Sequence, residues 1–153
     1  MTVTALQEVS AKDATDAREL LSEDDFRAVT EAVLSDNSEM GRESASRIVV
    51  EALKYVATAA KFPEAEMRPS ALVDKGWHAL ILNTPVYEEL CSLLGAFVHH
   101  VPDQPASASA RTHVLDRTQE LMAEAGHGPD LTLWLESGSA MCCNTCGPKK
   151  PSN

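Results

Sequence analysis

Apolar residues recur every three to four positions in five successive stretches of this chain, the spacing that places them on one face of an α-helix. Pro63, Pro69, Pro85 and Pro102 separate the stretches, and each proline disfavours the helical conformation of the residue before it. The pattern predicts helices at about 23–35, 38–62, 70–83, 84–101 and 109–125, and a short apolar segment at 131–135. We therefore expect an all-α, single-domain bundle of about five helices with an irregular, cysteine-containing C-terminal tail.

Residues that favour helix ends agree with these boundaries. Ser22 and Ser70 are candidate N-caps of the first and third helices. Thr84 is expected to cap the fourth helix, and Gly126 to close the fifth in the left-handed conformation. The apolar stripe of the 38–62 helix contains no ligand-type residue, so we assign that helix to packing alone.

The composition limits the partners and the location that we expect. The chain of 153 residues has a net charge of −10, which disfavours nucleic acids and anionic membrane surfaces as partners because both bind clustered Lys and Arg. No apolar run approaches the roughly 18 residues that span a bilayer, and residues 1–8 lack a secretory signal pattern. We expect a cytoplasmic protein with a partly ordered arm at 1–20, a helical domain at 21–135 and a Cys-rich tail at 136–153.

The side chains most suited to chemistry gather in and after the third predicted helix. Asp74 and His78 are four residues apart, so a helix points both the same way, at the border of the apolar face that contains Trp77. A half-buried pair left without partners costs roughly 1–3 kcal/mol, so the two groups should bond to each other, bind a metal, or meet a partner from the next helix. That helix is predicted to end with His99 and His100.

Adjacent histidines on a helix point about 100° apart, so only one of the two is expected to share a site with His78. We select His99, because it lies closer to the predicted packing seam that contains Cys91. His100 is then rotated toward the surface or a second metal. Cys91 itself is assigned to packing.

The predicted tail contains Cys142, Cys143 and Cys146, and the last two form one Cys-x-x-Cys. This spacing is half of a zinc site and also the layout of a dithiol redox motif. A second copy is absent from the sequence, so closure of a zinc site would need histidines from the helical domain. The alternative is an irregular tail with exposed thiols.

These residues suggest a small helical protein that binds a transition metal through His78 and His99, supported by Asp74, with His100 or the tail thiols completing the site. Imidazole, carboxylate and thiolate ligands favour zinc, with iron and copper as alternatives. A second hypothesis is an interaction scaffold whose Cys-rich C-terminus a partner enzyme reads or modifies, and a third is a metalloenzyme with an open coordination position. The sequence contains no Walker loop, dinucleotide-binding fingerprint or nucleophile elbow, so whether the chain is an enzyme stays open.

One resemblance to a known family supports a helical domain. The chain has Asp-x-x-Trp-His at 74–78 and Phe-x-His-His at 97–100, with Tyr87, Cys91 and Gly95 between them. In these motifs it resembles the glycine-rich domain-containing protein family, in particular its small stand-alone bacterial members, over roughly residues 20–105. The resemblance implies a helical domain with clustered histidines.

Overall fold

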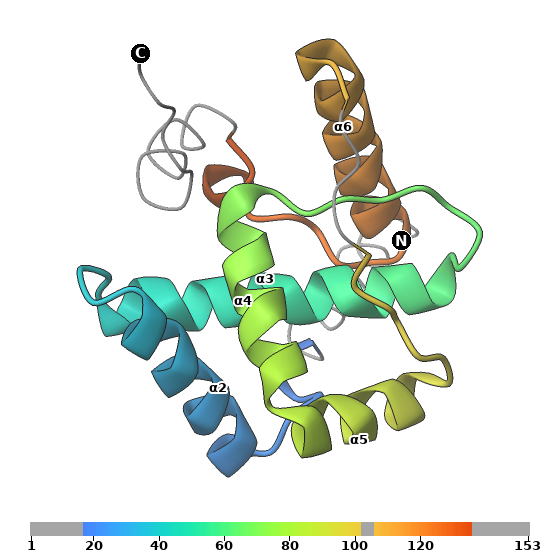
Figure 1. Cartoon of the computed structure of the whole chain (residues 1–153). Helices are drawn as coiled ribbons and strands as arrows, with labels where there is room; N and C mark the ends of the chain where they lie inside the picture. The colour runs from blue at the N-terminus through green and yellow to red at the C-terminus, as the bar shows by residue number, and fades with distance from the viewer. Residues whose placement is uncertain (1–16, 102–105, 136–153) are drawn as a thin grey trace, which may run out of the picture.

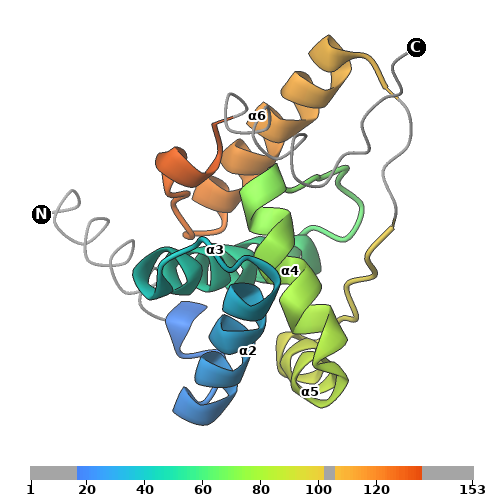
Figure 2. The ribbon, with the colours of Figure 1, turned by 60° about the vertical axis from the view of Figure 1, so that its left-hand side comes forward.

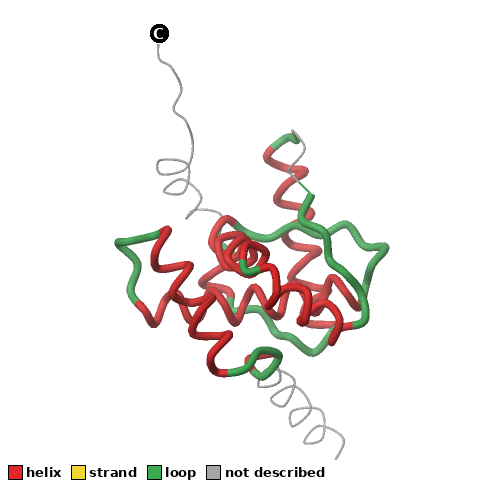
Figure 3. Tube along the Cα trace, turned by 60° about the horizontal axis from the view of Figure 1, so that its bottom comes forward, coloured by secondary structure: helices red, strands yellow, loops and turns green. Residues whose placement is uncertain are grey.

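The computed structural model describes residues 17–101 and 106–135, and within these ranges the chain forms helices and loops but no β-strand (Figures 1 and 3). The helices are α2 (Glu23–Asp36), α3 (Arg42–Lys61), α4 (Ala71–Leu82), α5 (Thr84–Leu94) and α6 (Ala108–Glu124), followed by a 3₁₀ turn, η1 (Leu131–Leu133). The predicted all-α single domain is confirmed. The predicted arm and tail fall almost entirely outside the described residues.

Serine side chains cap the N-termini of three helices. Ser22 accepts a hydrogen bond from the third residue of α2, and Ser70 and Ser107 do the same for α4 and α6. The predicted caps Ser22 and Ser70 are therefore confirmed. The starts of the other two helices differ from the prediction. Helix α3 starts at Arg42 rather than at 38, after a turn at 37–40, and Asn83 rather than the predicted Thr84 is the N-cap of α5.

Helix α3 lies at the centre of the molecule, with α4 crossing it and α6 on the opposite side from α2 and α5 (Figures 1 and 2). Gly76 is the residue of α4 that permits the crossing. A Cβ atom at this position would lie 2.8 Å from the Ile48 carbonyl oxygen and 3.0 Å from the Ala52 Cβ. The two helices therefore approach more closely than any larger residue at position 76 would allow.

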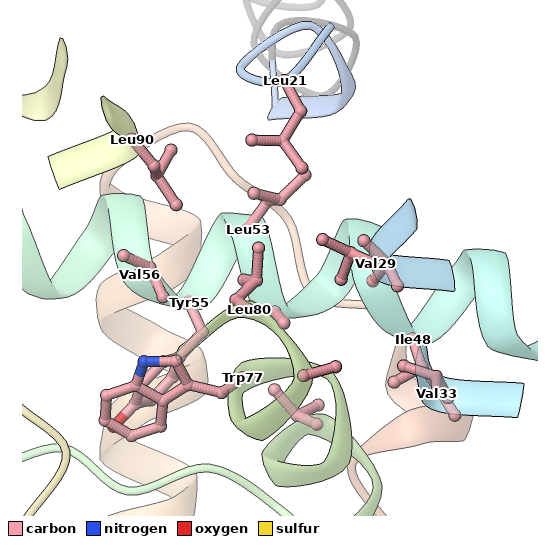
Figure 4. Close-up of a cluster of buried hydrophobic side chains, with 14 of the residues drawn as sticks. Leu21, Val29, Val33, Ile48, Leu53, Tyr55, Val56, Trp77, Leu80 and Leu90 are labelled. Atoms are coloured by element: carbon pink, nitrogen blue, oxygen red, sulfur yellow. The ribbon is translucent and has the colours of Figure 1, made fainter. Parts of the chain in front are cut away.

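The core is built where α2, α4 and α5 pack on α3. Leu53 from α3 and Leu80 from α4 lie near its middle and are fully buried (Figure 4). The rings of Tyr55 and Trp77 pack beside them with centroids 4.9 Å apart. Burial of each large apolar side chain contributes about 1.5–3 kcal/mol, so this cluster stabilises the packing of α2, α4 and α5 on α3.

A buried ionic network joins α3 to the segment that follows α6. Glu51 is 1% exposed, and its Oε2 accepts hydrogen bonds from the Asp130 backbone N–H at 2.7 Å and the Trp134 indole at 2.8 Å. Its Oε1 lies 3.3 Å from the Nζ of Lys54, which also donates to the Gly128 carbonyl oxygen at 3.0 Å. Helix α3 therefore packs on its neighbours through two buried charged groups as well as through its apolar stripe.

Asp130 makes a second, more exposed ion pair with α3. Arg47 donates to its Oδ2 from Nη2 at 2.6 Å, and Thr132 donates to its Oδ1 at 2.7 Å. Burial alone would raise the pKa of Asp130, but these hydrogen bonds outweigh burial and hold that pKa below its ordinary value. The network orients the predicted apolar segment at 131–135, which forms one 3₁₀ turn and buries Trp134.

Helix α5 ends seven residues before the predicted end at 101. Gly95 follows Leu94 with a φ of 85°, and its N–H donates to the Cys91 and Ser92 carbonyl oxygens. This left-handed residue stops the helix, as Gly126 does after α6 with a φ of 90°. Residues 96–101, here named the connecting segment, then continue without helical structure.

No helix in the two described ranges has both the length and the apolar composition that a bilayer crossing requires.

Candidate ligand-binding site

Two hydrogen bonds fasten the connecting segment against α4 and α5. The Tyr87 hydroxyl accepts a hydrogen bond from the Trp77 indole at 3.0 Å and donates to the Val98 carbonyl oxygen. Burial raises the pKa of Tyr87 well above its ordinary value, so the hydroxyl keeps the proton that it donates. Two residues later, His100 Nε2 lies 2.9 Å from Asp74 Oδ1. Asp74 therefore meets a partner that follows α5 in the chain, whereas the sequence predicts a partner on that helix itself.

The two histidines of the connecting segment contact different parts of the molecule. The ring of His100 packs on Trp77 with centroids 4.4 Å apart, whereas the ring of His99 packs on Phe97 at 4.7 Å. Each histidine also lines a different cavity. His99 was selected to share a site with His78 on the assumption that residues 99 and 100 are helical. That assumption is wrong, because α5 ends at Leu94.

His100 lines a cavity of about 490 Å³, here named the polar cavity. Its charged lining consists of Asp36 from α2, Arg68 from the loop before α4, Asp74 and Lys75 from α4, and Arg111 from α6. Three cationic side chains thus face two carboxylates, in a chain whose net charge is −10. The volume falls within the roughly 300–1,000 Å³ of typical small-molecule sites.

His99 lines a second cavity of about 360 Å³, here named the apolar cavity. Its walls come from the end of α3, the loop before α4 and the connecting segment. Most of the lining side chains are apolar or aromatic, including Tyr55, Phe62, Met67 and Phe97.

The structure brings together part of the predicted metal-binding set. Asp74 and His100 are in contact, and His78 lines the same polar cavity but is exposed rather than half-buried as expected. Within residues 17–101 and 106–135, no group of three or more His, Cys, Asp or Glu side chains is placed to hold a metal ion. Cys142, Cys143 and Cys146 lie outside these residues, so metal binding stays a prediction. Cys91 is buried, in agreement with its assignment to packing.

Arg68 and Arg111 were not identified as candidate site residues from the sequence. They are separated by 42 intervening positions, and a loop and the first turns of α6 bring both to the polar cavity. In a sequence, an arginine in a loop and an arginine on a polar helix both look like ordinary surface residues. Only the packing of α6 against α3 shows that they face one cavity.

The family comparison gives a different result from the resemblance in the motifs. The family model that matches the chain is described as UCP032817-like and covers residues 16–120, which is more than half of the chain. Neither the curated proteins nor the solved structures contain a match to this chain. The resemblance to the glycine-rich domain-containing protein family is therefore wrong, since the matching family is another one. The match includes α2 to α5 and most of α6, and on this evidence the chain belongs to the UCP032817-like family.

Proposed function

We propose that this chain is a binding protein for a small acidic ligand, which occupies the polar cavity. The observation that carries the proposal is the excess of cationic over carboxylate side chains on the lining of this cavity. A strongly acidic chain repels anions in general, so a local excess of positive charge favours the binding of an anion. A smaller cavity of about 230 Å³ has the same balance of charges, but its Arg47 and Lys54 pair with Asp130 and Glu51.

The chemistry of the lining suits a carboxylate or a phosphate. Arg68 and Arg111 carry planar guanidinium groups, which form paired hydrogen bonds with such anions. Ala71, the first residue of α4, also lines the cavity, so the positive end of the helix dipole lies nearby. His100, held against Asp74, and the exposed His78 add ring nitrogens that donate when protonated.

Isothermal titration with inorganic phosphate and with succinate tests the proposal. Arg111→Gln is expected to weaken binding by about tenfold or more, because a hydrogen bond to a charged group contributes about 1.5–3 kcal/mol. Arg117→Gln is the matched control: this arginine is also exposed on α6 and pairs with Glu120 at 3.0 Å, away from the polar cavity.

Both variants lose one positive charge, so they change the long-range field of the protein equally. An effect confined to Arg111→Gln supports a specific site. Equal weakening in both variants would mean diffuse attraction rather than a site, and no binding of either anion would reject the proposal.

A transition metal is the second candidate ligand, favoured by the 2.9 Å contact of His100 Nε2 with Asp74 Oδ1 and by His78 on the same cavity. Neighbouring ligands of a tetrahedral zinc, with bonds of about 2.0–2.2 Å, lie roughly 3.3–3.6 Å apart, so these two atoms would exchange their hydrogen bond for the metal by separating a few tenths of an ångström. It ranks second because Arg68, Lys75 and Arg111 line the same cavity and repel a cation.

Metal analysis of untagged protein separates the two candidates. A bound metal should be lost in His100→Ala and kept in His99→Ala, since His99 lines the apolar cavity instead. A content below about a tenth of an equivalent in the unmodified chain would reject the metal.

A further inference from the structure

The polar and apolar cavities have part of their lining in common, and these shared residues form one wall of each. Arg68, Pro69, Trp77 and Val101 line both of them. The loop residue Arg68 is fixed at this junction, because its backbone N–H donates to the Thr118 hydroxyl of α6 at 3.0 Å. A ligand that lies along this wall would contact the charged lining at one end and the apolar lining at the other.

Two large apolar side chains of the apolar cavity are left in contact with water. Phe97 is 55% exposed and Val101 is 67% exposed, although both line the apolar cavity. Large apolar groups gathered beside a concave site mark places where another apolar group binds, because covering them removes apolar surface from water. Among the described residues no carboxylate lines the apolar cavity, and Arg68 is the one cationic side chain on its lining, so a second charged group would find no counter-charge there.

We propose that the ligand is an amphipathic carboxylate, with its acidic group in the polar cavity and an unbranched hydrocarbon tail in the apolar cavity. This inference rests on the proposed function and adds the class of ligand. Charge complementarity favours the position of the head group, since Lys75 and Arg111 line the polar cavity and not the apolar one, while Arg68 lines both. The apolar side chains that line the neighbouring cavity favour a hydrocarbon tail.

The proposal requires that affinity increase with the length of the tail. Burial of one methylene group contributes about 0.8 kcal/mol, which corresponds to about fourfold tighter binding for each added methylene. The increase should stop when the tail fills the apolar cavity. A ligand with the same tail and no acidic group should bind much more weakly.

Titration of the full chain with propionate, hexanoate and octanoate measures this dependence, with octan-1-ol as the uncharged probe and inorganic phosphate as the head-group probe. Ala59→Phe should remove the increase from propionate to octanoate, because Ala59 lines the apolar cavity and a phenyl ring would occupy the space of the tail. Phosphate affinity should stay unchanged in this variant, which also shows that the fold is intact. Ala123→Phe, at an exposed position of α6 outside both cavities, is the matched control.

The possible failures are distinguishable. Equal affinity for propionate and octanoate overturns the amphipathic ligand, whereas phosphate binding that depends on Arg111 still supports the proposed function. Equal binding of octan-1-ol and octanoate, without phosphate binding, overturns both, because the head group would then contribute nothing. A chain-length effect that persists in Ala59→Phe places the tail elsewhere and also overturns this inference.

Discussion

Replacing Glu51 by glutamine tests how the buried ionic network stabilises the fold. The carboxylate accepts two hydrogen bonds on Oε2 and faces the Lys54 ammonium with Oε1. The glutamine oxygen can still accept from the Asp130 N–H and the Trp134 indole. The glutamine NH₂ group then faces Lys54, which is only 11% exposed in its side chain and keeps the Gly128 carbonyl as its acceptor. A buried cation is left without its counter-charge.

Removal of one partner from a buried ion pair typically costs about 3–5 kcal/mol. We expect the lower end, about 3 kcal/mol, because Lys54 retains one acceptor and some contact with water. For a domain of about 150 residues this corresponds to a melting temperature lower by about 6–12 °C. Urea denaturation followed by circular dichroism measures the change in the free energy of unfolding.

The double variant Glu51→Gln with Lys54→Met is the control. It removes the unpaired charge, so it should be more stable than Glu51→Gln alone. If Glu51→Gln changes the free energy of unfolding by less than about 0.5 kcal/mol, the charge contributes no more than an ordinary surface group. A double variant less stable than the single one would show that Lys54 stabilises the fold without Glu51. Either result refutes the reasoning.

Three further variants test other contacts. Gly76→Ala should destabilise the protein by about 1–3 kcal/mol in urea denaturation, because the added Cβ lies 2.8 Å from the Ile48 carbonyl oxygen; an unchanged midpoint would contradict the close helix crossing. Because the folded-state pKa of Asp130 lies below its usual value, its contribution to stability is present above pH 3.8 and is lost as the pH falls below that value. The free energy of unfolding should thus fall less between neutral and acid pH in Asp130→Asn than in the unmodified chain. An equal decrease in both proteins would exclude a contribution from the pair with Arg47. Tyr87→Phe should lower stability by about 1–3 kcal/mol in thermal denaturation, since the two groups that its hydroxyl bonds lose their partner; a melting temperature within about 1 °C of the original would rule this out.

The positions of most helices could be predicted because their signals are local. The caps of α2 and α4 are serines within one turn of the residues that they bond, and Gly126 directly follows the last turn of α6. Apolar spacing identifies the face of α4 that packs on α3 through Trp77 and Leu80. Each of these features depends on a few neighbouring residues, so a sequence is sufficient to recognise it.

The ionic network could not be predicted, because its partners are far apart in the chain. Glu51 and Lys54 look like the solvent-facing residues that interrupt any amphipathic stripe. They are buried only because the segment containing Asp130 folds over them, and 78 residues lie between Glu51 and Asp130. No local pattern indicates which helix face a distant segment will cover. The same reason explains why Arg68 and Arg111 were missed.

The error at the end of α5 has a different origin, because both signals were local and they conflicted. Leu90, Leu94 and Val98 continue the four-residue spacing of a helix, while Gly95 favours its end. The glycine determines the outcome, since its N–H bonds the last carbonyl groups of α5 in a conformation that strains other residues by about 1–2 kcal/mol.

The end of α5 at Gly95 determines which histidine belongs to the candidate site. On a helix, His99 and His100 would point about 100° apart, and the packing seam would place His99 rather than His100 beside His78. In the non-helical connecting segment they line two different cavities, and His100 contacts Asp74. A residue with a Cβ at position 95 would strain the turn that starts this segment, so it should weaken the contact of His100 with Asp74 without changing either side chain. The composition of the polar cavity thus depends on a backbone conformation outside it.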